Sequence, residues 1–269
     1  MANTVYSNFY LENEIEDQYA SRLDLQNFFK VDNTLEGVPG MTKVVNVYSG
    51  ANGAQKLAQG YGNTQTVGIS YTPKTYDITL AQSKFEYYDE EAMKDPMLVP
   101  TGLQYMGVNM FNTVNADVYG ELANATLSVD LGAGGYFGAF ADAVAELNVE
   151  NLDDVTINAF VSPADTSALR QGLNTNLQYV EDFVRTGYIG TVCGVNVYTK
   201  KDATEGTIYV ATNTAVTVFN KRGMEIEALT EGNRGASEAN TRLNTIFARK
   251  YYLAALTDAT KVVAIDVNP

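Results

Sequence analysis

Residues 43–86 place the strongest constraint on how this chain can fold. Three segments alternate like β-strands, namely Lys43–Tyr48, Thr66–Tyr71 and Thr75–Leu80, and the stretch between the first two is rich in Gly and Asn. Such runs between β segments mark turns. The pattern predicts a long β-hairpin with a polar tip and few apolar residues of its own. Because an isolated two-stranded ribbon is marginally stable in water, the hairpin needs a partner surface, either in the same chain or on a neighbouring molecule.

A long amphipathic helix is predicted after the hairpin. Beyond Pro100, apolar residues recur at spacings of three and four, and polar residues lie on the other side. This is the period of an α-helix with one buried face, and it continues for about two dozen residues. The apolar positions of the predicted helix are Leu103, Met106, Met110, Phe111, Val114, Val118 and Leu122.

The second half of the chain mixes helices and strands. Asp153–Pro163 alternates as a strand, and Ala164–Leu173 follows it as a short helix. Thr186–Lys200 then combines glycines with β-branched and aromatic residues, which is typical of a turn that feeds short strands. The fold class is therefore α+β, with further strands predicted at Gly206–Thr212, Ala215–Asn220, Ile226–Leu229, Arg242–Leu256 and Lys261–Asp266.

The first 31 residues carry an amphipathic pattern. Ile15, Tyr19 and Leu23 are spaced as on one face of a helix, and acidic residues lie toward the N-terminal end of the segment. Such a segment packs into the core of its own subunit, or it forms an arm that buries its apolar face on a neighbouring one. The sequence alone favours neither.

The composition excludes several classes of function. The chain has 269 residues, no histidine and one cysteine, Cys193. The missing histidine excludes Ser-His-Asp and Cys-His hydrolases and histidine-ligated metal sites. A single cysteine excludes a disulfide framework and a multi-cysteine metal site. Because Cys193 lies in an apolar alternating run, we predict a buried, inert thiol.

The charge of the chain limits its partners. The net charge is −14 and Lys and Arg do not cluster, which argues against sequence-specific binding of nucleic acid. A shell lined with acidic residues could still enclose DNA. A membrane-spanning helix needs about 20 consecutive apolar residues, and no run in this sequence approaches that length. The N-terminus lacks the pattern of a signal peptide. We therefore predict no membrane contact and assembly in the compartment of synthesis.

Two patterns match a cofactor or catalytic site only in part. Gly132-Ala-Gly134 resembles the start of a dinucleotide-binding motif, but Phe137 occupies the third glycine position and no alternation of strands and helices follows. Carboxylates are adjacent at 89–91, 153–154 and 181–182, but a glycosidase needs two that face each other across a cleft. We predict a loop and solvated charges here, with no catalytic residue, no cofactor site and no metal site.

The order of the elements resembles the major capsid proteins of tailed bacteriophages, which have the HK97-like fold. The resemblance rests on the hairpin, the long helix, the Val161-Ser-Pro strand end, the pattern Gly187-x-Ile-Gly-x-Val-x-Gly-x-x-Val and the final segment Tyr251–Ile265. It implies an α+β, HK97-like capsid fold with an N-terminal arm, an extended β-hairpin loop, a long spine helix and a mixed α/β A domain. The implied regions are the arm (1–38), the extended loop (39–88), the spine helix and start of the peripheral domain (89–130), the axial or A domain (131–220) and the C-terminal strands that complete both domains (221–269).

The function implied by the resemblance is structural, not enzymatic. The protein would self-assemble, as hexamers and pentamers, into an icosahedral shell that encloses double-stranded DNA. Contacts between subunits are expected at Phe9, Ile15, Tyr19, Leu23, Tyr48, Tyr61 and Lys56. In some relatives a hairpin lysine is crosslinked to an asparagine of a neighbour, but for Lys56 an ordinary surface lysine is expected.

The resemblance also implies partners and a location. Scaffolding, portal and decoration proteins are the expected partners, with the scaffold separate because no extra region precedes the arm. The location would be the virion capsid, assembled in the host cytoplasm. Two alternatives stay open, an encapsulin-type compartment that encloses cargo enzymes and a carboxylate-based enzyme.

Overall fold

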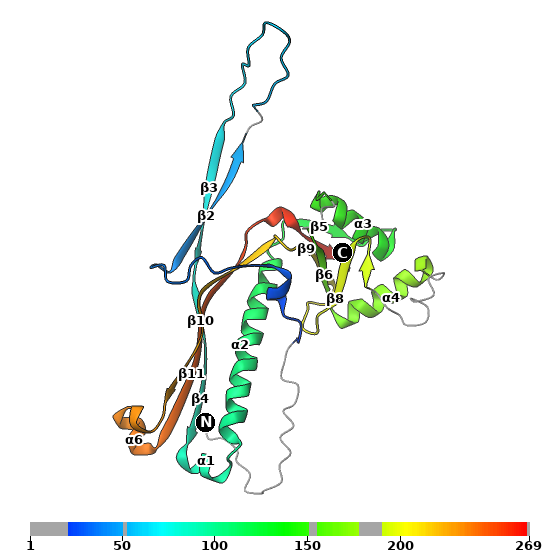
Figure 1. Ribbon diagram of the computed structural model, residues 1–269. Coiled ribbons are helices and arrows are strands. Elements are labelled where there is room, and N and C mark those ends of the chain that lie inside the picture. Colours follow the sequence, from blue (N-terminus) through cyan, green and yellow to red (C-terminus); the bar gives the residue numbers. More distant parts are fainter. Residues whose placement is uncertain (1–20, 51–52, 151–154, 178–189, 268–269) are drawn as a thin grey trace.

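The computed structural model describes residues 21–50, 53–150, 155–177 and 190–267. Within these residues the chain is elongated, and a β-hairpin projects beyond one end of a four-stranded sheet (Figure 1). A six-stranded sheet with its own helices lies to the side, and helix α2 (Leu98–Leu122) runs along the four-stranded sheet. The predictions of an α+β fold and of one long helix are confirmed.

The four-stranded sheet has the order β1–β10–β11–β4. Its bounds are Lys30–Asp32 for β1, Val216–Leu229 for β10, Leu243–Leu256 for β11 and Thr79–Tyr88 for β4. The short β1 pairs with only the first residues of β10. Beyond Asn220, the outer edge of β10 therefore has no strand partner within the described part of the chain.

Helix α2 packs on this sheet through most of the apolar face that the sequence predicts, but Leu103, which was counted in that face, is 38% exposed. Met106, Met110 and Val114 are buried with Ile246 and Tyr252 of β11 in one cluster. Helix and strand approach each other closely at Gly102, where an added Cβ would lie 2.5 Å from the Phe85 ring of β4. The short helix α1 (Asp89–Lys94) connects β4 to this region.

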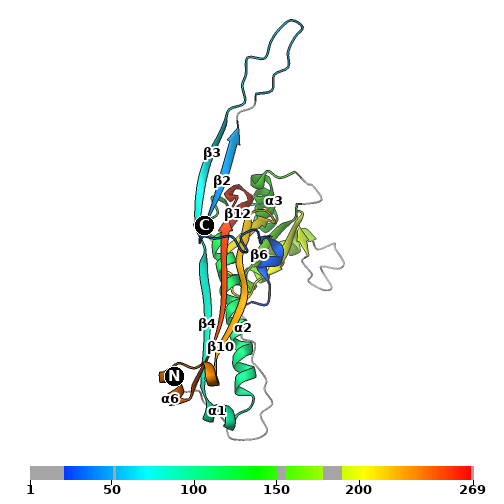
Figure 2. The ribbon, with the colours of Figure 1, turned by 60° about the vertical axis from the view of Figure 1, so that its left-hand side comes forward.

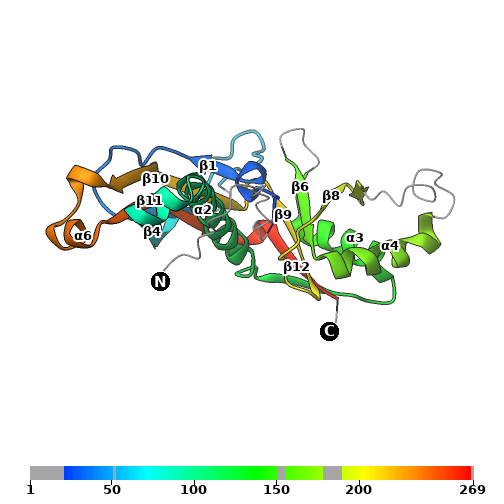
Figure 3. The same ribbon diagram turned by 90° about the horizontal axis from the view of Figure 1, so that it is seen from below.

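The six-stranded sheet has the order β5–β12–β9–β6–β8–β7. Its bounds are Leu127–Asp130, Val262–Asp266, Thr207–Thr212, Ile157–Val161, Val195–Thr199 and Thr191–Val192, in that order. Helices α3 (Gly135–Leu147) and α4 (Pro163–Leu177) accompany this sheet, whereas α2 lies over the other one (Figure 3).

Both faces of the six-stranded sheet are buried. Along β6, Ala159 and Val161 face the cluster that contains Phe140 of α3. Phe160 points to the opposite face, where it packs with Val118 of α2 and with Leu25 of the 3-10 helix η1 (Leu25–Phe28). A period of two with apolar residues on both faces is the pattern of a central strand. The end of α2 and η1 thereby join the two sheets into one body.

The hairpin consists of β2 (Thr42–Gly50) and β3 (Ile69–Asp77) in antiparallel register. The sequence predicted that one strand ends at Tyr71 and the next runs from Thr75 to Leu80. In the structure β3 continues to Asp77, and β4 begins at Thr79, after the single residue Ile78. Pro73 made the pattern look interrupted, but proline is tolerated in an edge strand, and both strands of a ribbon are edges.

Three further predictions need correction. Strand β10 is continuous, although two strands were expected, because bulges between Asn220 and Glu225 carry the polar residues that interrupt the pattern. Helix α6 (Ala236–Thr241) was not predicted. Cys193 is only half-buried, because it occupies the tight turn between β7 and β8 with φ 50°, beside Gly194 at φ 82°. Burial still raises the pKa of its thiol.

Several predictions fall outside the described residues. These are the contact residues Phe9, Ile15 and Tyr19, the carboxylate pairs at 153–154 and 181–182, and most of the glycine-rich segment before Gly190.

Candidate assembly surfaces

The hairpin exposes apolar residues along its length. Ile69 is 73% exposed, Tyr71 63% and Val44 about half. Tyr48 is the register partner of Tyr71. Figure 2 shows that the ribbon continues the direction of the four-stranded sheet and extends well past the rest of the subunit. Exposed aromatic and β-branched residues on a ribbon with no covering element mark a surface for another molecule.

The tip of the hairpin is ordered by polar contacts of its own. The Asn63 side chain donates a hydrogen bond to the Gly53 carbonyl at 3.0 Å and accepts one from the Gln65 amide at 2.8 Å. Gly53 has no room for a side chain, since a Cβ would lie 2.5 Å from Val67 Cγ2. Lys56 and Tyr61, both predicted contact residues, are exposed in this tip, Tyr61 at 75%.

The base of the hairpin is fixed to the body. The Tyr76 hydroxyl donates to the Leu256 carbonyl at 3.2 Å, and the Ile78 amide donates to the Met41 carbonyl at 2.8 Å. Lys43 Nζ lies 5.3 Å from the centre of the Phe219 ring. Burial raises the pKa of Tyr76, which keeps its hydroxyl protonated as a donor. The ribbon therefore leaves the body in a defined direction.

The opposite end of the sheet is held together by Arg234. Its guanidinium, 8% exposed, donates to Asp89 Oδ1 and Oδ2 at 2.5 and 3.0 Å and to Asn244 Oδ1 at 2.6 Å. Asn244 in turn donates to Asp89 at 2.7 Å. These hydrogen bonds, from Arg234 first, hold the pKa of Asp89 below its ordinary value. The network ties the segment that carries α6 to the start of α1.

Exposed apolar side chains also gather on this end of the molecule. Met93 is 81% exposed in α1, and Met97 precedes α2. Met224 and Ile226 are exposed on β10, beyond the point where β1 stops pairing. An open strand edge with apolar side chains is a second surface suited to contact with another chain.

Leu23 is the one predicted contact residue of the N-terminal segment that the structure describes. It is partly buried against the core beside η1. The buried Asn115 of α2 holds this region, because its amide donates to the Leu23 carbonyl at 2.6 Å and accepts from the Leu25 amide at 2.9 Å. Leu23 thus has contacts in its own subunit.

Lys200 and Tyr119 form a buried contact that was not singled out from the sequence. Lys200 is fully buried, forms an ion pair with Asp202, and has its Nζ 4.6 Å from the centre of the Tyr119 ring. The Tyr119 hydroxyl accepts from the Thr204 amide at 3.1 Å. Together they fix the loop between β8 and β9 on α2. The sequence gives no signal for the contact of Lys200 with Tyr119 or of Arg234 with Asp89, because these partners are distant along the chain.

The acidic side chains were the remaining candidates for a metal or catalytic site. No group of three or more Asp, Glu, Cys or His side chains is placed to hold a metal ion in this part of the chain. Asp89 and Glu90, from one of the carboxylate runs, pair with Arg234 and Arg242. In the described ranges no helix is both long and apolar enough to cross a membrane.

Known proteins similar to this chain are capsid proteins. No protein-family model matches. The chain is 26% identical over 257 residues to the major capsid protein of Staphylococcus phage phiMR11, which covers 93% of this chain and 89% of that protein.

Solved structures show the same fold at lower sequence identity. The capsid of cyanophage P-SCSP1u has a TM-score of 0.75 and 13% identity, covering 97% of this chain and 92% of its own. A chain of Mycobacterium phage Che8 has a TM-score of 0.68 and 16% identity, covering 98% and 96%. A virus-like particle from Pyrococcus furiosus has a TM-score of 0.59 and 13% identity, covering 91% and 92%.

The two sheets, the long helix and the projecting hairpin therefore form the HK97-like capsid fold. In sequence the chain is similar to a major capsid protein of a phage, and in fold it is similar to solved phage capsid proteins.

Proposed function

We propose that this protein is the subunit of a closed icosahedral shell, arranged as pentamers and hexamers, that encloses double-stranded DNA. Shell assembly takes place in the host cytoplasm with separate scaffolding and portal proteins and, in some shells, decoration proteins. The five regions outlined from the sequence, from the arm at 1–38 to the closing strands at 221–269, are the domain scheme of this proposal.

The projecting hairpin is the observation that carries the proposal. Its base is fixed to the body by Tyr76 and Lys43, whereas the side chains of Ile69 and Tyr71 are mostly exposed to solvent in the described part of the subunit. Burial of apolar surface contributes about 25 cal/mol per Å², so a neighbour that covers this ribbon gains stability. Repetition of the same contact by identical subunits forms a closed ring when the rotation between neighbours closes, and the pentamers and hexamers of the shell are such rings.

The contact residues of the proposal lie on the hairpin and on the N-terminal segment. The ribbon contacts the next subunit through Tyr48, Lys56 and Tyr61. The N-terminal segment does so through Phe9, Ile15, Tyr19 and Leu23. Lys56 acts as a surface cation and forms no crosslink. The protein catalyses no reaction and needs no cofactor.

The enclosed DNA is held without sequence-specific contacts. The net charge of −14 is that of a wall which repels phosphate. Packaged DNA is then confined by the shell itself.

The test is the size of the purified full-length protein, measured by negative-stain microscopy and light scattering. Closed shells, or pentamers and hexamers that close when concentrated or given scaffold, are expected. A protein that stays monomeric under all these conditions contradicts the proposal.

A matched variant removes only the outer hairpin. Val47 and Thr72 are register partners, so residues 48–71 can be replaced by Asn-Gly while the base contacts stay. We expect this variant to fold as a subunit and to form no shells. Shells of normal size from this variant would contradict the role of the ribbon.

The alternative is an encapsulin-type compartment. The observation that favours it is the similarity in fold to the virus-like particle from Pyrococcus furiosus. The contents of shells isolated from producing cells separate the two. Nuclease-resistant DNA supports the proposal, whereas a single copurifying cargo protein supports the alternative.

A further inference from the structure

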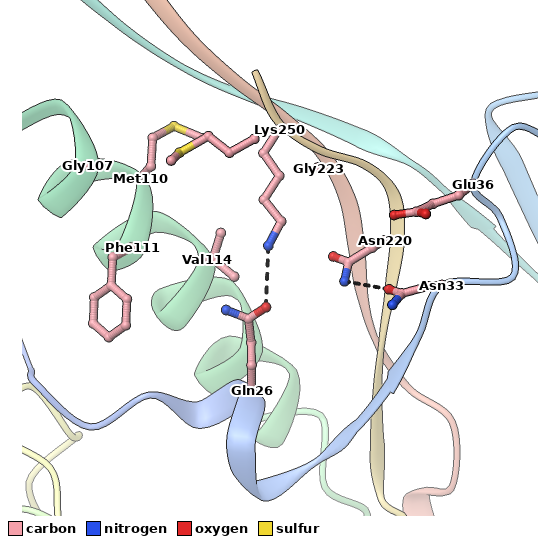
Figure 4. Close-up of a pocket in the computed structure, with 11 residues that line it drawn as sticks. Gln26, Asn33, Glu36, Gly107, Met110, Phe111, Val114, Asn220, Gly223 and Lys250 are labelled. Atoms are coloured by element: carbon pink, nitrogen blue, oxygen red, sulfur yellow. Dashed lines mark hydrogen bonds between the residues drawn. The ribbon is translucent and has the colours of Figure 1, made fainter. Parts of the chain in front are cut away.

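A groove of about 370 Å³ lies between α2 and β10 (Figure 4). Met110, Phe111 and Val114 of α2 form an apolar side, and Met224 of β10 faces them. Gln26, in η1, closes one end. The groove therefore adjoins the place where the described chain begins, at Ser21.

Lys250 projects into this groove without a carboxylate partner. Its Nζ donates to Gln26 Oε1 at 3.3 Å and lies 5.5 Å from the centre of the Tyr252 ring. Within the described ranges no Asp or Glu oxygen comes within ion-pair distance, and Glu36 lines the far side as an exposed residue. Burial lowers the pKa of Lys250, with Asp24 partly opposing. A half-buried cation beside apolar side chains is stabilised when an anion joins it.

The first 17 residues of the chain offer such an anion. Glu12, Glu14, Glu16 and Asp17 are acidic, and residues 1–20 contain no Lys or Arg. Ile15 lies among these carboxylates, with Leu11 and Tyr19 on either side, so the segment offers both apolar side chains and anions to a groove that is apolar with one cation. Asp17 lies four residues before Ser21, where the described chain begins, and an extended chain of that length spans up to about 14 Å.

Other occupants fit the charge less well. The hairpin carries Lys43, Lys56 and Lys74 against Asp77 alone, and like charge disfavours its approach to Lys250. DNA phosphate would have to approach a chain with net charge −14 and pass Glu36.

We propose that the acidic stretch Glu12–Asp17 occupies this groove in its own subunit, with one of its carboxylates paired to Lys250. The pair anchors the base of the N-terminal segment on α2 and β10. Residues further upstream, Phe9 among them, are then directed away from the subunit and toward a neighbour, whereas Ile15 packs in this groove and leaves the set of contacts with the next subunit.

The test is zero-length crosslinking with a water-soluble carbodiimide, which joins a carboxylate and an amine as an amide with loss of water. Unlabelled and ¹⁵N-labelled proteins are denatured, mixed and refolded together. The mixture is then treated with the carbodiimide, digested and analysed by mass spectrometry. We expect a peptide that links Lys250 to the 12–17 stretch, with both halves carrying the same isotope. Peptides of mixed isotope would show that a neighbour's segment fills the groove, and would overturn the proposal.

Two controls keep the result specific. Lys250→Gln must remove the crosslinked peptide, whereas Lys221→Gln, on the neighbouring strand β10, must leave it at the wild-type yield. A crosslink to Glu36 has a different mass and does not count. If the wild-type protein, folded by circular dichroism, gives no link between Lys250 and residues 12–17, the proposal is wrong whether or not shells form.

Discussion

The six-stranded sheet and the hairpin use the same kinds of residues in opposite ways. In the sheet, Phe160, Ile208 and Val210 are fully buried, with helices or other strands on both faces. In the hairpin, Ile69 and Tyr71 are mostly exposed on a ribbon with no covering element in the described structure. Both regions read as β-structure in the sequence, so the difference lies in what covers them.

This difference separates stability from assembly. Apolar area buried inside the subunit stabilises its fold, whereas apolar area left on the hairpin contributes only when another copy covers it. Substitutions in the sheet should therefore lower the free energy of unfolding of the single subunit. Substitutions in the hairpin should change assembly and leave that free energy nearly unchanged.

The largest effect on folding is expected for Phe160→Ala. The Phe160 ring lies 5.6 Å from that of Phe28 and 5.9 Å from that of Phe29, measured between ring centres. Truncating a fully buried Phe leaves a cavity and costs about 3–5 kcal/mol. Urea denaturation of unassembled subunits measures this cost. A loss below about 1 kcal/mol would mean that the sheet is no better packed than the hairpin.

A smaller loss is expected for Gly102→Ala, where α2 meets β4. The new Cβ would lie 2.5 Å from the Phe85 ring, so the ring or the helix must move, at a cost of about 1–3 kcal/mol. Gly120→Ala in the same helix is the matched control, because nothing lies within 4 Å of its Cβ. That control should gain up to about 1 kcal/mol from helix propensity. Equal effects of the two changes on thermal unfolding would contradict the close approach.

The Arg234 network should give the end of the four-stranded sheet a pH dependence. The pKa of Asp89 is lowered from 3.8, so its contribution is present above pH 3.8 and is lost as the pH falls through the lower folded value. The protection of the amides of residues 234–242 against hydrogen exchange, expressed relative to the intrinsic exchange rate at each pH, should therefore fall in acid. Asp89→Asn should exchange faster already at neutral pH and lose this dependence. Glu90→Gln, which alters the exposed pair with Arg242, is the control and should change little. An unchanged acid profile in Asp89→Asn would exclude Asp89 as the titrating group.

The local sequence pattern was sufficient to predict the helices and strands, but not to predict which residues contact each other across the fold. The period of α2 and the alternation of β6 appear in the sequence because each depends on residues close together in the chain. The contact of Arg234 with Asp89 joins positions 145 apart, and the Asn115 bond to Leu25 joins positions 90 apart. No local signal encodes such pairs. The continuity of β10 and the separation of β3 from β4 were missed for a related reason, since bulges and a one-residue link are set by the neighbouring strands.

The smallest effect on folding is expected for the double change Ile69→Ser and Tyr71→Ser in the hairpin. These side chains are exposed in the subunit, so the free energy of unfolding should change by less than about 0.5 kcal/mol. Assembly, followed by light scattering at fixed protein concentration, should slow or stop, because the ribbon then has less apolar surface for a neighbour to cover. Thr72→Ser in the same strand controls for a general disturbance of the hairpin. If the double variant assembles like wild type, the exposed ribbon is not what holds subunits together; if it unfolds, the ribbon is part of the subunit's own core.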